Sequence, residues 1–298
     1  MSNHNRTTMM KHLIGSHLSI AGGLENAAIE AKALGMRCVQ VFTKNQRQWS
    51  APPLKDETVE KWHAAVKDAK LKTTVSHDSY LINPGSTDAG TRKKSIDLLV
   101  VEIENCATLK IPYLVMHPGA HLGDGEEKGI DRIAKGIDQA HERTSDADVL
   151  TCLEVTAGQG TNLGYKLEHL AAIIDRCDSA ERLGVCLDTA HLIAAGYDLT
   201  SGDGMASVIK EIKQVLTFDR IKVIHVNDSK VERGKRVDRH EHIGMGHVSP
   251  EAFGVLLNHK VLGKLPLILE TPKGEAPDGR SWDLVNIEAL EAMAETNS

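Results

Sequence analysis

The chain has 298 residues and a formal charge of −6, from 35 lysine and arginine against 41 aspartate and glutamate side chains. This acidic balance argues against a protein that coats nucleic acid through bulk charge, although a local basic groove is compatible with it. The 41% hydrophobic content predicts a folded chain with a large core. No apolar run approaches the roughly 20 residues of a membrane span.

Two residue types stand out in this composition. The chain has 15 histidines, but only three Phe, three Trp and four Tyr. None of its five cysteines forms a CxxC pair, which indicates reduced thiols rather than a disulfide framework or an all-cysteine zinc finger. The polar segment Met1–Met10 has no signal-peptide core, so we expect a cytoplasmic protein. We expect a disordered extension over residues 1–11 and one domain over residues 12–298.

Eight short segments rich in Val, Ile and Leu recur along the chain, each followed by a helical pattern. The predicted strands are His12–Ser16, Cys38–Thr43, Thr73–His77, Tyr113–His117, Val149–Glu154, Gly184–Asp188, Ile221–His225 and Pro266–Glu270. The predicted helices are Leu24–Leu34, Glu57–Ala69, Arg92–Leu109, Gly129–Arg143, Lys166–Arg176, Met205–Val215, Pro250–Leu257 and Trp282–Ala294. This alternation predicts a parallel sheet, and eight units indicate an α/β protein with a single-domain (β/α)8 TIM barrel. A doubly wound sheet would require the glycine-rich phosphate-binding motif GxGxxG after the first strand, and Ala21-Gly22-Gly23 does not match this motif.

Six of the eight predicted strands end in a residue type that binds divalent metals. These residues are His77, His117, Glu154, Asp188, His225 and Glu270. The carboxyl ends of barrel strands form the face that holds the active site, so we expect these side chains to converge there. The residues two positions earlier share the same face and are small or branched and apolar, as a barrel interior requires: Val75, Val115, Cys152, Cys186, Val223 and Ile268.

Three further candidate metal ligands lie close to these residues in the sequence. His191 comes three residues after Asp188, which is one turn if a helix begins there, and Asp238 and His240 share one side of an extended segment. A single histidine at a strand end is more often a hydrogen-bonded structural residue than a ligand. Four neighbouring carboxylates, however, are too costly to bury without cations, so the nine residues together predict a multinuclear metal site. Nitrogen and oxygen ligands without thiolate suit Zn²⁺ or Mn²⁺.

At these residues the sequence resembles the endonuclease IV family of apurinic/apyrimidinic endonucleases, from Gly15 to Thr271. The family-like stretches are Phe42–Trp49, His77–Asn83, His117–His121, Thr156–Gly160, Cys186–His191, Ala195–Asp198 and Val237–His240. The resemblance implies a TIM barrel that holds three Zn²⁺ ions, with Mn²⁺ an alternative at one position. It also implies a monomeric, nucleoid-associated enzyme that acts on duplex DNA. Such an enzyme cleaves on the 5′ side of abasic sites, leaving a 3′-hydroxyl and a 5′-deoxyribose phosphate, and trims blocked 3′ ends.

The resemblance also assigns roles to individual residues. It implies His77, His117 and Glu154 for the first zinc, Glu154, Asp188, His225 and Glu270 for the second, and His191, Asp238 and His240 for the third. Glu154 would be catalytic because it bridges two ions, and Glu270 because it orients the attacking water. The residues implied for DNA binding are Lys44, Asn45, Gln46, Arg47, Tyr80 and Leu81. Arg47, Tyr80 and Leu81 would enter the minor groove and hold the duplex kinked; the alternative is that Tyr80 and Leu81 only cap the barrel.

Some features depart from the family pattern. Val155 stands where the family usually has Asn, and residues 244–248 and 272–280 are divergent. His17 and His121 are left outside the predicted ligand set. The competing hypothesis is a sugar isomerase or epimerase of the xylose isomerase-like group. Such an enzyme needs only about four metal ligands and a proton-transfer residue, so His191, Asp238 and His240 and the loops of Arg47 and Tyr80 would have no role. A catalytically inactive binder of damaged DNA would have lost ligands, and none is missing.

Overall fold

The computed structural model describes residues 11–296. The predicted extension over residues 1–11 therefore lies, except for its last residue, outside the described residues. Within residues 11–296, no helix is long and apolar enough to cross a lipid bilayer.

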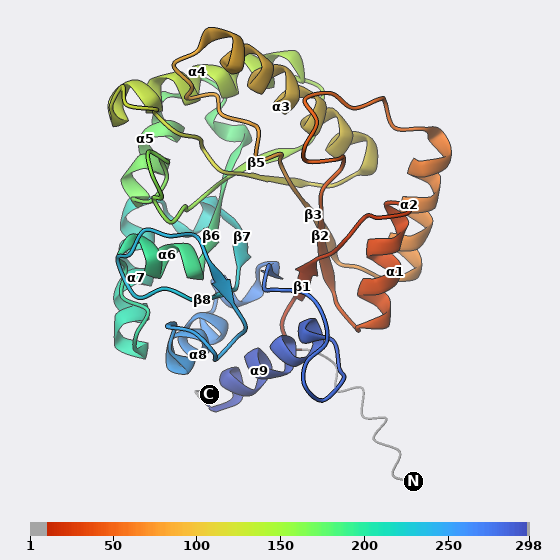
Figure 1. Cartoon of the computed structure of the whole chain (residues 1–298), viewed down its shortest axis with the longest axis vertical. Coiled ribbons are helices and arrows are strands. Elements are labelled where there is room, and N and C mark those ends of the chain that lie inside the picture. Colours follow the sequence, from red (N-terminus) through yellow and green to blue (C-terminus); the bar gives the residue numbers. More distant parts are fainter. Residues whose placement is uncertain (1–10, 297–298) are drawn as a thin grey trace.

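Parallel strands close into a barrel, in the order β1-β10-β7-β6-β5-β4-β3-β2 (Figure 1). The strands are β1 Ile14–His17, β2 Cys38–Val41, β3 Thr73–His77, β4 Tyr113–Met116, β5 Leu150–Glu154, β6 Leu183–Asp188, β7 Ile221–His225 and β10 Leu267–Leu269. Each overlaps a predicted strand, so the predicted TIM barrel is confirmed. A separate two-stranded antiparallel sheet, β8 (Asp228–Ser229) with β9 (His240–Glu241), was not among the predicted elements.

Helices surround the barrel in the described chain (Figure 1). They are α1 Glu25–Ala33, α2 Asp56–Asp68, α3 Ala89–Leu109, α4 Glu126–Arg143, α5 Leu167–Arg176, α6 Thr189–Ala195, α7 Gly202–Val215, α8 Pro250–Asn258 and α9 Trp282–Thr296, with short 3₁₀ turns at Ala180–Arg182, Phe218–Arg220 and Leu262–Lys264. Helices α3 and α7 begin one turn before their predicted starts because polar residues cap them: the side chains of Asp88 and Ser201 accept backbone N–H groups. The first turn of such a helix lacks the apolar period that marks the rest.

The predicted interior layer of the barrel is confirmed. Cys38, Val75, Val115, Cys152, Cys186, Val223 and Ile268 form one buried cluster inside the strands, separate from the larger core between strands and helices. Packing is tight where β1 meets β2, since a Cβ atom at Gly15 would lie 2.0 Å from the carbonyl oxygen of Cys38. Only glycine fits at that position.

The segment from β8 to β9 folds back over the carboxyl ends of the strands. The carboxylate of Asp228 accepts hydrogen bonds from the backbone N–H groups of Gly244, Gly246 and Val248, at 3.0, 2.9 and 2.9 Å. This contact anchors the divergent stretch 244–248 behind the hairpin. The hairpin in turn places Asp238 and His240 above the barrel.

Candidate metal centre

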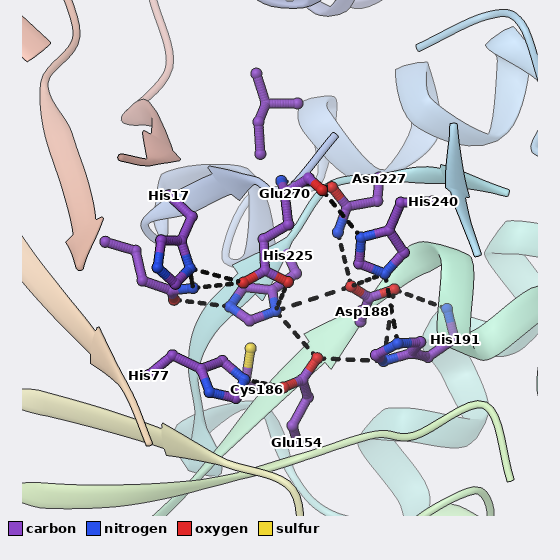
Figure 2. A network of polar contacts seen from close by, with 12 residues as sticks. His17, His77, Glu154, Cys186, Asp188, His191, His225, Asn227, His240 and Glu270 are labelled. Atoms are coloured by element: carbon purple, nitrogen blue, oxygen red, sulfur yellow. Dashed lines mark hydrogen bonds and ion pairs between the residues drawn. The ribbon is translucent and has the colours of Figure 1, made fainter. Parts of the chain in front are cut away.

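Six of the predicted ligands project from the carboxyl ends of barrel strands. His77, Glu154, Asp188 and His225 are the last residues of β3, β5, β6 and β7, while His117 and Glu270 directly follow β4 and β10. The barrel therefore brings together side chains that lie far apart in the sequence. Figure 2 shows His77, Glu154, Asp188, His225 and Glu270 pointing toward one another.

Glu154 lies between two groups of ligand atoms. It is fully buried, and its Oε2 atom is 3.1 Å from Nε2 of His77 and 3.3 Å from Nε2 of His117. Its Oε1 atom is 3.0 Å from Nδ1 of His225. One carboxylate thus faces both groups, which is the arrangement a bridging ligand requires.

His225 is the centre of the second group. Its Nδ1 atom lies 3.1 Å from Oε2 of Glu270 and 3.8 Å from Oδ2 of Asp188. One donor atom from each of Glu154, Asp188, His225 and Glu270 lies within 4.8 Å of the others. The four residues implied for the second zinc therefore lie close enough together to share one ion.

The third group lies at the mouth of the barrel. Asp188 caps α6 by accepting the N–H of His191 at 2.7 Å, so the predicted helical turn between these residues is present. The Oδ1 atom of Asp238 is 3.2 Å from Nε2 of His191 and 3.5 Å from Nε2 of His240. The structure therefore brings together all nine predicted ligands, and the third group adjoins the other two.

Three of the five predicted imidazole ligands are oriented as metal ligands are. His191 donates from Nδ1 to the carbonyl of Val155 (2.8 Å), and His77 to the carbonyl of Asp78 (3.0 Å). His240 donates from Nδ1 to the carbonyl of Glu270 (3.2 Å). A carbonyl can only accept, so each ring presents its other nitrogen, unprotonated, to the centre when neutral. The residues present thus fit a group of divalent ions.

The electrostatics of the centre also favour bound cations. Burial lowers the pKa of His77, His191 and His225, but the surrounding negative groups outweigh burial and raise all three pKa values well above 6.5. Burial likewise raises the pKa of Glu154 and Glu270, but the positive charge of His225 and hydrogen bonds from neighbouring histidines together outweigh it and hold both well below 4.5. The carboxylates therefore stay ionised and require positive charge nearby, which divalent ions supply.

Three polar residues at the centre lie outside the predicted ligand set. Gln40 on β2 donates to Oε1 of Glu270 at 2.6 Å and accepts from Nε2 of His225 at 2.8 Å. Asn227 donates to Oδ2 of Asp188 at 2.8 Å, and its Oδ1 accepts the N–H of Glu270 at 2.7 Å. His17 lies 3.2 Å from Glu270 through Nδ1. A glutamine inside the apolar strand Cys38–Val41 was the sequence signal for the first of them.

An open cavity of about 500 Å³ leads from the surface to the metal centre. Its lining includes His117, Asp238 and Tyr80, which also line a neighbouring cavity of about 570 Å³. Tyr80 is 71% exposed between the two, whereas Leu81 is half-buried against the core. Tyr80 thus projects into solvent beside the centre and does not cap the barrel.

The residues predicted to bind DNA after β2 do not all face solvent. Asn45 and Arg47 are exposed, and Asn45 accepts the N–H of Arg47 through Oδ1 at 2.9 Å. Gln46 is half-buried. Lys44 departs from the prediction, because it is only 7% exposed and its Nζ atom donates inward, to the carbonyls of Asn45 (2.9 Å) and Gln48 (2.8 Å). Its ammonium group is not placed to contact a DNA phosphate.

Comparison with known proteins identifies the family to which this chain belongs. A family model described as xylose isomerase-like TIM barrel matches residues 29–295. The chain is 43% identical over 279 residues to the probable endonuclease 4 of Chloroflexus aggregans, covering 94% of this chain and 96% of that protein. It is 42% identical over 288 residues to the probable endonuclease 4 of Geobacter sulfurreducens, covering 95% of each.

Solved structures agree with these relatives. Endonuclease IV from Thermus thermophilus matches with a TM-score of 0.82 at 33% identity, covering 95% of this chain and 99% of that one. A D-tagatose 3-epimerase-like protein matches with a TM-score of 0.72 at 19% identity, covering 96% and 99%, and this likeness shows the fold alone. The chain therefore belongs to the endonuclease IV family and is a metal-dependent nuclease built on a xylose isomerase-like TIM barrel.

Proposed function

We propose that this nuclease hydrolyses the phosphodiester on the 5′ side of abasic sites in duplex DNA, leaving a 3′-hydroxyl and a 5′-deoxyribose phosphate. It also removes blocking groups from 3′ ends, and it works as a cytoplasmic, nucleoid-associated monomer. One observation supports this function most strongly: the nine predicted metal ligands lie close together, and six of them line a cavity that the exposed Tyr80 also lines.

Three Zn²⁺ ions are the proposed cofactors, with Mn²⁺ an alternative at one position. His77, His117 and Glu154 would hold the first, Glu154, Asp188, His225 and Glu270 the second, and His191, Asp238 and His240 the third. When bound, these ions supply Lewis-acid chemistry: they lower the pKa of water and neutralise charge that develops on the phosphate oxygens. Mixed nitrogen and oxygen donors without cysteine support zinc over metals that prefer thiolate.

The side chains themselves position the reacting groups. Glu154 is fixed by His77, His117 and His225, so both of its oxygens keep their direction. Glu270 accepts from Gln40 and lies on the cavity wall, where its carboxylate would orient the attacking water. Asp238 and His240, nearer the mouth, face the side from which the scissile phosphate would enter.

The loops beside the cavity would supply recognition of the lesion. The ring of Tyr80 is exposed to solvent next to the candidate metal centre, and Leu81 lies behind it. On the neighbouring loop, Asn45, Gln46 and Arg47 offer hydrogen-bond donors to DNA. Inserting an apolar wedge costs a few kcal/mol of stacking per base step, and an abasic position has already lost part of that stacking. Selectivity for abasic DNA would then come in part from the ease of deforming it.

Cleavage of a labelled duplex with one tetrahydrofuran abasic analogue tests the proposal. Zinc-replete protein without added Mg²⁺ should cut immediately 5′ to the analogue and leave the undamaged duplex intact, and a chelator should abolish cutting. The product should prime a polymerase, since it ends in a 3′-hydroxyl. Absence of a cut at that position would refute the proposed function.

A further inference from the structure

Lys44 begins a short loop, residues 44–49, that follows β2 and contains Arg47. We call this segment the Arg47 loop. Its backbone is gathered around one buried ammonium group, because Nζ of Lys44 donates to the carbonyls of Asn45 and Gln48 at 2.9 and 2.8 Å. Both carbonyls belong to the loop itself, so Lys44 fixes the path of the chain on either side of Arg47.

Helix α3, packed below the Arg47 loop, supplies a negative group close to the charge of Lys44. Glu102 on that helix is fully buried, and its Oε1 atom lies 3.9 Å from Nζ of Lys44. Its Oε2 atom accepts the hydroxyl of Thr43 at 2.7 Å, and Asn105 donates to the same hydroxyl at 3.2 Å. Burial raises the pKa of Glu102 to about 7, while the Thr43 hydroxyl and the Lys44 charge oppose that rise. Lys44 thus supplies a positive charge that favours the ionised form of this buried carboxyl group.

The Arg47 loop is also joined to the loop that carries Tyr80. The hydroxyl of Ser79 donates to the carbonyl of Gln46 at 2.9 Å and accepts the N–H of Leu81 at 3.3 Å. The rings of Phe42 and Tyr80 meet edge to face, with centroids 5.8 Å apart. The two loops proposed to contact DNA thus form one connected unit. The Lys44–Glu102 pair attaches this unit to the core.

We propose that Lys44 and Glu102 are positioning residues, which raise affinity for DNA by holding the Arg47 loop and the Tyr80 loop in their binding arrangement without touching DNA. The inference rests on the proposed function. A loop that is already ordered loses less conformational entropy when it binds, so the anchor improves affinity without any contact of its own. A lysine that contacted phosphate directly would act differently, because it would add to the release of counterions.

Salt dependence separates these two actions. Removal of one phosphate contact should lower the slope of log K against log salt concentration by about 0.9. We expect K44M and E102Q to weaken equilibrium binding of the abasic-analogue duplex by about tenfold while leaving the salt slope at the wild-type value. R47A should weaken binding and also lower the slope by about 0.9. E104Q, which removes an exposed carboxylate from the same helix, is the matched control and should bind as the wild type does.

Three further measurements distinguish positioning from a general structural role. Metal content and the single-turnover rate at saturating DNA should equal the wild-type values in K44M and E102Q, so that only the affinity changes. Amide hydrogen exchange of residues 45–49 and 79–81, measured without DNA, should be faster in both variants. K44R, which keeps the charge, should recover part of the affinity. If K44M does not fold, K44R and E102Q still provide the comparison.

Two outcomes would overturn the inference alone. One is a salt slope in K44M that falls as far as in R47A, which would make Lys44 a direct phosphate contact. The other is wild-type affinity in folded K44M and E102Q. A wild-type protein that neither binds nor cuts the abasic-analogue duplex would refute the proposed function itself, so the two failures are told apart by the wild-type control.

Discussion

His191 donates a hydrogen bond from Nδ1 to the backbone carbonyl of Val155, at 2.8 Å, and so turns its Nε2 atom toward Asp238, 3.2 Å away. The contact uses the main chain of residue 155 and not its side chain. The buried valine, where the resemblance leads us to expect asparagine, therefore leaves this predicted ligand directed at Asp238. The departure from the expected pattern does not disturb this member of the third group.

Replacing His191 with alanine should remove the third metal ion selectively. The other predicted ligands of that group, Asp238 and His240, lie near the mouth of the cavity and would not retain an ion by themselves. We expect H191A to lose about one of three metal ions per chain in elemental analysis after purification without chelators. The control is H247A, which removes an exposed histidine. A full wild-type metal content in H191A would contradict this assignment.

Removing the exposed ring of Tyr80 should impair cleavage without affecting the metals. The side chain is 71% exposed and makes its ring contacts at one edge of the cavity, so little folding energy depends on it. Loss of an aromatic stacking surface costs about 1–3 kcal/mol, so Y80A should cut the abasic-analogue duplex about 5- to 150-fold less efficiently. Zinc content should stay unchanged. I29A, which shortens an exposed apolar side chain on α1, should cut normally; equal activity in Y80A would exclude Tyr80 from the mechanism.

The barrel and the convergence of the six strand-end residues could be predicted from sequence because both depend on periodicity. Short apolar runs that alternate with helices specify the parallel strands, and parity along each strand then fixes which face a residue occupies. Val223 and His225 illustrate this: the first lies in the interior layer and the second, two residues later, at the metal centre. Neither inference needed a contact between distant residues.

Side-chain direction in the loops could not be predicted, because tertiary contacts decide it. Lys44 follows β2 in a basic stretch, and only the buried Glu102 on α3 reveals that its ammonium group turns inward. Gln40 and Asn227 were missed for the same reason, since their importance lies in the carboxylates they hold. The hairpin that brings His240 back to the centre is stabilised by Asp228, whose partners lie beyond it in the sequence.

The thiols should be unreactive in the folded protein. All five cysteines lie within the described chain and are buried. Burial raises the pKa of Cys38 and Cys177 to about 12 and that of Cys186 to about 11, and it also raises the pKa of Cys106 and Cys152. Since the thiolate is the reactive form, native protein at pH 8 should show almost no reaction with DTNB, whereas protein in guanidinium chloride should release five equivalents. Rapid labelling of one or more native thiols would contradict the buried positions.

His141 should make the folded state sensitive to mild acid. Its ring is buried and contacts the hydroxyl groups of Ser179 at 2.7 Å and Thr151 at 2.9 Å. Burial, with the nearby Arg182 charge, lowers its pKa to about 4. Between pH 4 and 6.5 the unfolded chain therefore binds the extra proton and the folded chain does not, so the free energy of unfolding falls as the pH falls through this window. Above pH 6.5 the ring is neutral in both states and the effect disappears.

The variant H141Q isolates this contribution. Glutamine is neutral throughout and can still exchange hydrogen bonds with the two hydroxyl groups. From about pH 7 to pH 5 the wild type should lose about 2 kcal/mol of unfolding free energy relative to H141Q. Urea unfolding of both proteins, after the metals have been removed by a chelator, measures that difference without contributions from metal release. Parallel pH dependence of the two proteins would show that His141 is not the residue that titrates, because every other group is common to both.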